Sequence, residues 1–389
     1  MESLITDTST HPVIGVFPNN WEFSRFGREF ERSNERNGDS PIGPMLSVSE
    51  YRGIEVRTNF RDGQLPSEDV SHYRVVRPGQ LVANLMWLDH GGLGVSHFAG
   101  YVSPAYMAFN ISERVAPAFA HHVLRSSVYV DSYKRLGRGV RPNSQMVDSV
   151  DLRQLPFPLP PFETQQRIAD YLDRETAEID AAVADLDRYV ELLNVKLESA
   201  SREVFTELSA NHPLIQTKFL VDITTGSGDT QDSQENGGFP FYVRSDTIQR
   251  AEDFEFDCDA VLTSGDGAGV GKIFHLAGGK FKAHQRVYVM HNFKRVSPQY
   301  FYWMFKSAFP DAIRYGGAKS TVDSVRRPMI ANLKIPVPDH DAQEKASKRI
   351  EKLHHEVSAL IAKSTKLRDL LLKRRSVLIT EVVTGRKQV

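Results

Sequence analysis

The chain changes character within the stretch Leu155-Pro-Phe-Pro-Leu-Pro-Pro-Phe-Glu-Thr-Gln-Gln-Arg-Ile-Ala-Asp-Tyr-Leu-Asp173. Its prolines disfavour helical backbone in the residues that precede them, and Glu163 suits the positive N-terminal end of a helix. No proline or glycine occurs between Glu163 and Leu208, and these are the residues that most often interrupt helices. The stretch therefore predicts an extended approach and then one long helix, about 65–70 Å for 45 residues at the usual rise.

A second copy of this arrangement lies 178 positions further along the chain. The shift places Gln165 on Gln343 and gives eleven identical residues without a gap over 157–208. With a further slip of three residues, Val115-Ala-Pro falls on Val296-Ser-Pro. A repeat of this length indicates a duplicated fold, in which a globular block is followed twice by a helical block.

We expect four segments from this repeat. They are a first globular domain (1–155), a central long helix (156–212), a second globular domain (213–334) and a C-terminal long helix (335–389). Short β-type runs separated by turn residues, together with a helical pattern over 298–309, predict an α+β fold for each globular block. The expected architecture is two similar globular domains joined by two long helices, with a pseudo-two-fold internal repeat.

The two helical segments are predicted to pair with each other as an antiparallel coiled coil. In both, most apolar residues are spaced by three or four positions, which is typical of coiled coils. Segment 156–212 carries five basic against twelve acidic residues, whereas 335–389 carries twelve against seven. Opposite flanking charges favour pairing between the two, although either charged face could instead simply be solvated. The seam residues that we expect are Ile179, Leu186, Leu193, Val357, Leu360 and Leu371.

The composition excludes several classes of protein. A single cysteine, Cys258, rules out an internal disulfide framework and fits a reducing compartment. The start of the chain lacks the pattern of a signal peptide, and no apolar run is long enough for a membrane span. We therefore expect a cytoplasmic protein with no membrane partner.

Two sequence patterns suggest a phosphate-binding loop and a metal site, but neither meets the requirements of its motif. The segment Gly265-Asp-Gly-Ala-Gly-Val-Gly-Lys272 resembles a phosphate-binding loop, but Asp266 stands where that motif needs glycine, and Ile273 where it needs Ser or Thr. A glycine-rich loop between strands is the simpler interpretation. The histidine pairs His121-His122 and His354-His355 lack the spacing that places two ligands on one helical face. We therefore predict no metal site and no cofactor bound by this chain.

Residues 155–173 closely resemble the conserved helical region of the specificity subunits of Type I restriction–modification systems. The globular blocks also begin like the two recognition domains of that family. The first resembles it at Pro18–Trp21 and Phe30–Asn37, and the second at Lys218–Gly226. The second copy of the proline-rich motif departs from the family pattern, because Asp339-His340-Asp341 replaces Pro-Phe-Glu. The resemblance nevertheless extends over most of the chain.

This resemblance implies a non-catalytic subunit that reads a two-part target in double-stranded DNA through two target recognition domains. It implies as partners two methyltransferase subunits, which use S-adenosylmethionine, and allows for restriction subunits, which use ATP and Mg²⁺. The sequence has no segment similar to Asn-Pro-Pro-Tyr or Asp-Pro-Pro-Tyr, which the resembling adenine methyltransferases would carry. A coiled-coil scaffold with two ligand-binding lobes and no role with DNA is the alternative function, and a stand-alone nuclease or methyltransferase is a third.

The best candidates for DNA contact precede the two proline-rich junctions. Both windows mix glycine with cations and small polar residues, which suit base edges and phosphates. The candidates are Arg138, Arg141, Asn143, Ser144 and Gln145 in the first window, and Arg314, Lys319, Ser320, Thr321 and Arg326 in the second.

Overall fold

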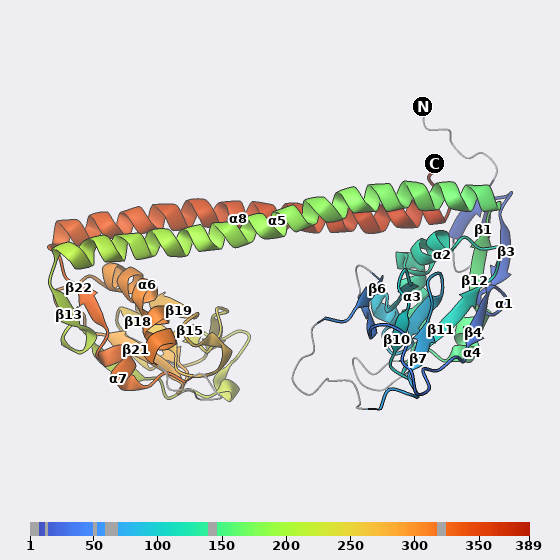
Figure 1. Cartoon of the computed structure of the whole chain (residues 1–389). Helices are drawn as coiled ribbons and strands as arrows, with labels where there is room; N and C mark the ends of the chain where they lie inside the picture. The colour runs from blue at the N-terminus through green and yellow to red at the C-terminus, as the bar shows by residue number, and fades with distance from the viewer. Residues whose placement is uncertain (1–7, 12–14, 50–52, 59–68, 139–145, 317–323) are drawn as a thin grey trace. The chain divides into compact units, whose positions relative to one another are not determined.

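The computed structural model describes the whole chain except residues 1–7, 12–14, 50–52, 59–68, 139–145 and 317–323 (Figure 1). The chain divides into two compact units. Unit 1 comprises Met1–Leu186 and Lys366–Val389, and unit 2 comprises Asp187–Thr365. Each unit contains one globular part and a portion of each long helix. The four linear segments expected above remain a prediction, because these units follow contacts in space.

The two long helices are α5 (Phe162–Asn211) and α8 (His340–Val383). Each is continuous, as the absence of proline and glycine predicts. Within unit 1, Asp180 on α5 accepts a hydrogen bond of 2.8 Å from Arg375 on α8. Within unit 2, Glu207 on α5 accepts one of 3.0 Å from Arg349 on α8. From the first pair to the second, the residue number rises along α5 and falls along α8, which confirms the antiparallel pairing. Both ion pairs join the acidic helix to the basic one.

Burial along the helices fixes the seam and corrects one expected residue. Ile179, Leu193 and Val357 are buried, and Leu186 and Leu371 are partly buried. Leu360 is 40% exposed and lies outside the seam. After Val357 the buried face continues through the partly buried Ile361 and the buried Ser364, a step of four and then three. Because residue 364 is a serine, a search for regularly spaced apolar residues does not find this continuation of the buried face.

The globular part of unit 1 contains a four-stranded antiparallel sheet in the order β4-β11-β8-β9. Its helices are α1 (Phe26–Glu29), α2 (Pro117–Leu124), α3 (Ser127–Leu136) and α4 (Ser149–Gln154). Its strands are β1 (Thr8–His11), β2 (Gly15–Pro18), β3 (Glu22–Arg25), β4 (Phe30–Ser33), β5 (Leu46–Ser49), β6 (Gly53–Val56), β7 (Arg74–Val76), β8 (Leu81–Asn84), β9 (Leu93–Val95), β10 (Gly100–Val102), β11 (Tyr106–Ile111) and β12 (Pro156–Leu159).

The globular part of unit 2 repeats this plan, with a sheet in the order β14-β21-β18-β19. Its helices are α6 (Pro298–Gly316) and α7 (Arg327–Ala331). Its strands are β13 (Leu214–Gln216), β14 (Asp222–Thr225), β15 (Phe239–Tyr242), β16 (Gln249–Ala251), β17 (Phe256–Asp257), β18 (Ala260–Ser264), β19 (Phe274–Ala277), β20 (Lys280–Ala283), β21 (Val287–His291) and β22 (Lys334–Pro336). The α+β class and the duplicated fold are therefore confirmed.

Each globular part has two hydrophobic cores. The larger core of unit 1 joins α2 and α3 to the start of α5 and the end of α8, and includes Phe119, Leu172 and Val382. The larger core of unit 2 joins α6 to the end of α5 and the start of α8, and includes Phe301 and Ile350. A second, smaller core in each unit includes other residues of the four-stranded sheet, which do not belong to the larger core. Because helix and sheet residues share a core, each globular part is held firmly against its long helices.

A buried glutamine repeats the same contacts in both units. In unit 1, the Gln165 Nε2 donates to the carbonyls of Arg114 and Pro160, and its Oε1 accepts from the Ala116 N–H at 2.9 Å. Both side chains are almost fully buried, at 1% exposure for Gln165 and 4% for Gln343. The partners of Gln343 are Arg295, Pro338 and Ser297. The internal repeat aligns these three residues with Arg114, Pro160 and Ala116, which are the partners of Gln165. We call this arrangement the glutamine clamp; it ties the first turn of α2 or α6 to the start of a long helix.

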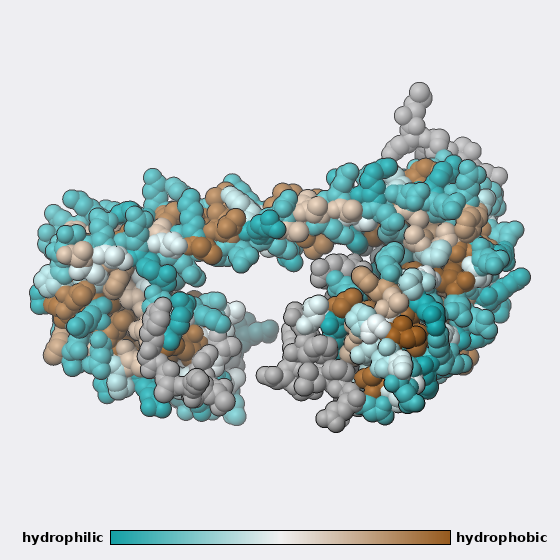
Figure 2. Space-filling model, in the orientation of Figure 1, coloured by the Kyte–Doolittle hydropathy of each residue, from teal (hydrophilic) through white to brown (hydrophobic). Residues whose placement is uncertain are grey.

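The face drawn in Figure 2 is mainly hydrophilic, with apolar patches on the helical pair. Tyr189, Leu192 and Val195 on α5 are 43%, 59% and 54% exposed. Among the residues that the structure describes, no helix is both long enough and apolar enough to cross a membrane.

Candidate nucleic-acid interface

The glycine-rich segment forms the turn between two neighbouring antiparallel strands, β18 and β19. Gly267 and Gly271 have φ of +77° and +66°, values that favour glycine because it lacks a Cβ. A short 3-10 turn over Gly267–Gly269 follows Asp266. The segment does not lead from a strand into the start of an α-helix, which a phosphate-binding loop requires. The glycines therefore serve a tight turn between strands, as the simpler interpretation predicts.

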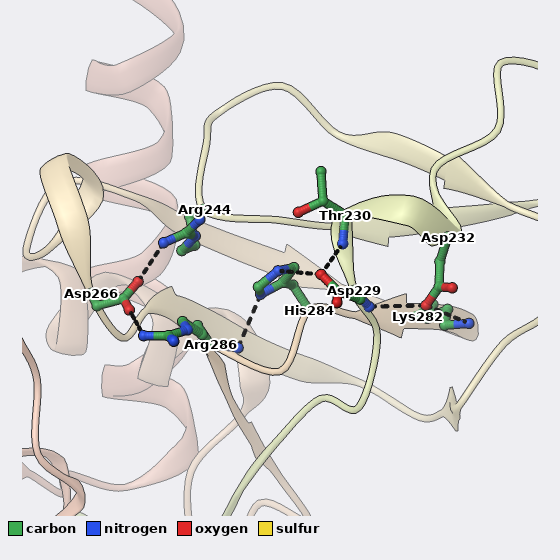
Figure 3. A network of polar contacts seen from close by, with 8 residues as sticks. All are labelled: Asp229, Thr230, Asp232, Arg244, Asp266, Lys282, His284 and Arg286. Carbon is green, nitrogen blue, oxygen red and sulfur yellow. Dashed lines mark hydrogen bonds and ion pairs between the residues drawn. The ribbon is translucent and has the colours of Figure 1, made fainter.

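Asp266, in this turn, holds two arginines side by side (Figure 3). The Arg244 guanidinium, from the residues after β15, donates to the Asp266 carboxylate at 2.8 Å. The Arg286 guanidinium, from the residues before β21, donates to the other oxygen of the same carboxylate. The two arginine side chains remain 44% and 61% exposed, while the Asp266 side chain is 17% exposed. Two exposed guanidinium groups are thus fixed on one partly buried carboxylate.

Asp266 stays ionised in this setting. Partial burial alone would raise the pKa of its carboxyl group, but the hydrogen bonds and charges of Arg244 and Arg286 outweigh burial and hold this pKa below its ordinary value. One carboxylate cannot neutralise two guanidinium groups, so the cluster keeps a net positive charge. Exposed, pre-positioned arginines are well suited to phosphate oxygens or to the major-groove edge of guanine.

A chain of polar contacts continues from Arg286 (Figure 3). The buried His284 ring accepts from the Arg286 backbone N–H at its Nδ1, over 3.1 Å. Burial, followed by the charge of Arg244, lowers the pKa of His284, which fits a neutral ring with its proton on Nε2. The Asp229 carboxylate lies 3.9 Å from that Nε2, and Asp232 accepts from the Asp229 N–H while pairing with Lys282. These contacts hold the residues around the arginine pair in fixed places.

Of the predicted DNA-contacting residues, three lie in the described part of the chain. Arg138 is 74% exposed and pairs with Asp151 at 2.7 Å. Arg314, near the end of α6, pairs with Asp311 at 3.3 Å. Arg326 is exposed and precedes α7. The other candidates lie outside the described residues: Arg141, Asn143, Ser144, Gln145, Lys319, Ser320 and Thr321.

The structure brings Arg314 and Arg326 together around one pocket in unit 2. Lys272, the last residue of the glycine-rich segment, lines the same pocket, as does Ser324. The backbone of Ser324 also pairs with that of Asp266 in an isolated antiparallel β-bridge. The pocket therefore adjoins the residue that anchors the arginine pair. Two sequence features considered separately, the glycine-rich segment and the window before the second junction, therefore meet at one site.

Sequence reasoning missed Arg244, Arg286 and the acidic anchor between them. Residues 244, 266 and 286 lie about twenty positions apart and belong to different strands and turns. The only usable signal was the glycine-rich turn itself, which suggested a tight approach of backbone but not which side chains it would hold.

Comparison with known proteins gives a consistent relationship. Residues 218–367 match the family model described as the Type I restriction modification DNA specificity domain. The specificity subunit of the Type I restriction enzyme EcoDI from Escherichia coli is 24% identical over 166 residues. That match covers 43% of this chain and only 36% of the relative. The resemblance expected from the sequence is confirmed.

The fold relationship covers almost the whole chain. A solved structure concerned with the complex assembly and conformational transition of the type I R-M system matches with a TM-score of 0.73. The match covers 95% of this chain and 99% of that one, at 16% sequence identity. Similarity at this level of identity establishes a shared fold, including the duplicated globular parts and the long helices.

Proposed function

We propose that this protein is the DNA-binding specificity subunit of a Type I restriction–modification complex, and that each globular part reads one half of a two-part target. The observation that carries the proposal is the duplication of a domain and its glutamine clamp in both units. Equivalent domains on a symmetric frame suit separated half-sites in DNA. The exposed arginine pair in unit 2 and the specificity-domain match over 218–367 support the same function.

In this proposal the chain recognises DNA and other subunits perform the chemistry. The partners would be two methyltransferase subunits with S-adenosylmethionine, with restriction subunits using ATP and Mg²⁺ as a further component. The described residues contain no cluster of three or more potential metal ligands. The protein would act on cytoplasmic DNA. A coiled-coil scaffold without DNA is less favoured, because the matched family is a DNA specificity domain.

Separable specificity tests this function. In complex with the methyltransferase, the double variant Arg141→Ala/Asn143→Ala should relax or change only one half of the methylated sequence. The double variant Lys319→Ala/Thr321→Ala should affect only the other half. Loss of a base contact costs about 1–3 kcal/mol of discrimination. The spacer between the halves should stay constant, because neither variant touches the helices.

The measurement is sequencing of the methylated adenines. Lys352→Ala, on an exposed face of α8, serves as control and should leave the target unchanged. A variant that alters both halves, or the spacer, would contradict two independent readers. Methylation with no sequence preference by the wild-type complex would reject the specificity function itself.

A further inference from the structure

The pocket in unit 2 is large and strongly basic. Its volume is about 1270 Å³, and α5, α6, α8 and the glycine-rich turn all contribute to its walls. Among the described residues, its basic side chains are Arg202, Lys272, Lys306, Arg314 and Arg326, and its one carboxylate side chain is Glu198. Such an excess of positive charge in a concave site with low-dielectric walls attracts anions.

Only part of this charge is neutralised within the chain. Asp311 pairs with Arg202 at 3.2 Å and with Arg314 at 3.3 Å. Among the residues that the structure describes, no carboxylate lies within 4 Å of the charged groups of Lys272, Lys306 or Arg326. Three cations from three separate segments thus border one cavity without an ion pair.

Lys306 is the most informative of these cations. Its ammonium lies 5.5 Å from the centroids of the Tyr302 and Trp303 rings, and 3.4 Å from the Tyr302 hydroxyl. Burial lowers the pKa of Lys306, and the charge of Asp246 offsets this only in part. A half-buried cation with such weak compensation lowers the stability of the fold, which suggests that its partner comes from outside the chain.

In unit 1, the equivalent cation is hydrogen-bonded within the chain. The position equivalent to Lys306 is Arg125, since each lies eight residues after the proline that begins its helix. The Arg125 guanidinium donates to the carbonyls of Ser49, Gly91 and Leu93. The same place in the fold therefore carries a cation in both units, but among the described residues only the cation of unit 1 donates to backbone carbonyls.

The wall beside Lys306 is aromatic and contains an unmet donor. The Trp303 side chain is buried, and its ring lies 4.5 Å from the ring of His354. The Trp303 indole N–H has no acceptor in the described part of the chain. Buried donors of this kind are rare and often mark the place of a water or ligand.

We propose that this pocket binds a backbone phosphate of the DNA strand that passes unit 2, with Lys272, Lys306 and Arg326 as its cationic contacts. The inference rests on the proposed function, and it adds a contact that unit 1 lacks. DNA is the favoured source of the phosphate because Arg314 and Arg326, which both belong to the second predicted DNA window, line this pocket. The bridge between Ser324 and Asp266 also joins the pocket to the exposed arginine pair.

The test measures the affinity of the assembled methyltransferase complex for its target DNA as a function of salt. Each lost phosphate contact lowers the slope of log K against log salt by about 0.9. Lys306→Met keeps the length of the side chain and removes its charge, and Arg326→Gln removes a second cation at an exposed position. Each variant should bind more weakly and with a smaller slope, and the double variant should lose about one unit of slope. The methylated sequence should stay the same, because a phosphate contact carries no base information. Lys352→Met, an equal change of charge outside the pocket, should not alter the slope.

A second arm locates the phosphate and separates the possible sources. Single phosphates along the second half-site are replaced by neutral methylphosphonate. One replacement should weaken the wild-type complex but not the Lys306→Met complex. If neither pocket variant changes the slope while the two-part target is still read, the pocket proposal is wrong and the proposed function stands. If ATP or inorganic phosphate binds in a Lys306-dependent way while the DNA slopes are unchanged, DNA is not the ligand. A wild-type complex that binds DNA without preference would instead overturn the proposed function.

Discussion

The two units share a frame but differ where the helix after each glutamine clamp meets its surroundings. Gln165 and Gln343 make the same three hydrogen bonds in the two units. Nine residues after the Ala116 or Ser297 partner, Arg125 is satisfied by three carbonyls, whereas Lys306 borders a basic pocket. The comparison teaches that the duplication preserves the contacts that orient each domain, while the surfaces beside them have diverged.

The helical pair is the shared feature that should be easiest to break. Leu193 and Leu192 are neighbours on α5, at 6% and 59% exposure. Leu193→Asp places a carboxylate in the seam and should cost about 4 kcal/mol of unfolding free energy. Leu192→Asp should change it by less than about 0.5 kcal/mol, as is usual at the surface. Urea unfolding followed by circular dichroism measures both. Equal effects of the two substitutions would place the seam on another face.

The glutamine clamp provides the next largest effect and tests whether the two units are truly equivalent. Gln165→Leu and Gln343→Leu each keep a similar volume but leave two buried carbonyls and one N–H without a partner. Unsatisfied buried groups cost about 1–3 kcal/mol each, so we expect a loss of roughly 3 kcal/mol for either variant. Hydrogen exchange should increase in α2 for Gln165→Leu and in α6 for Gln343→Leu. If one variant leaves the free energy of unfolding unchanged, the clamp stabilises only one unit, although its geometry is the same in both.

Local signals account for what the sequence could predict. The long helices follow from stretches without proline or glycine, and their pairing follows from opposite charge and regular spacing. The repeat itself was visible because Gln165 and the residues around it recur at a fixed distance. Leu360 was misplaced because the seam passes through a serine at 364, and a rule based on apolar residues continues in the wrong phase there.

The candidate site could be predicted only in part, because it is assembled by tertiary contacts. The windows around Arg314 and Arg326 were found from composition, and the glycine-rich turn from its motif. Nothing local indicates that Asp266 would hold Arg244 and Arg286. Lys306 resembles any lysine on a helix until the walls of the pocket around it are known.

The smallest expected effect, and the one with a change of sign, contrasts Arg125→Met with Lys306→Met. In unit 1 the substitution removes hydrogen bonds to three carbonyls and should cost about 2 kcal/mol. In unit 2 the pKa of Lys306 is lower in the folded state than its usual value of 10.5. The unfolded chain therefore binds this proton more tightly, and the penalty for the charge is fully present below the folded-state pKa. It is relieved as the pH rises toward 10.5. At pH 7, Lys306→Met should therefore leave the melting temperature unchanged or raise it slightly, and the difference from wild type should shrink above pH 10. Melting followed by circular dichroism at pH 7 and pH 10.5 measures both variants. A clear loss of stability for Lys306→Met at pH 7 would mean that this cation has a structural partner, and the contrast between the two units would then disappear.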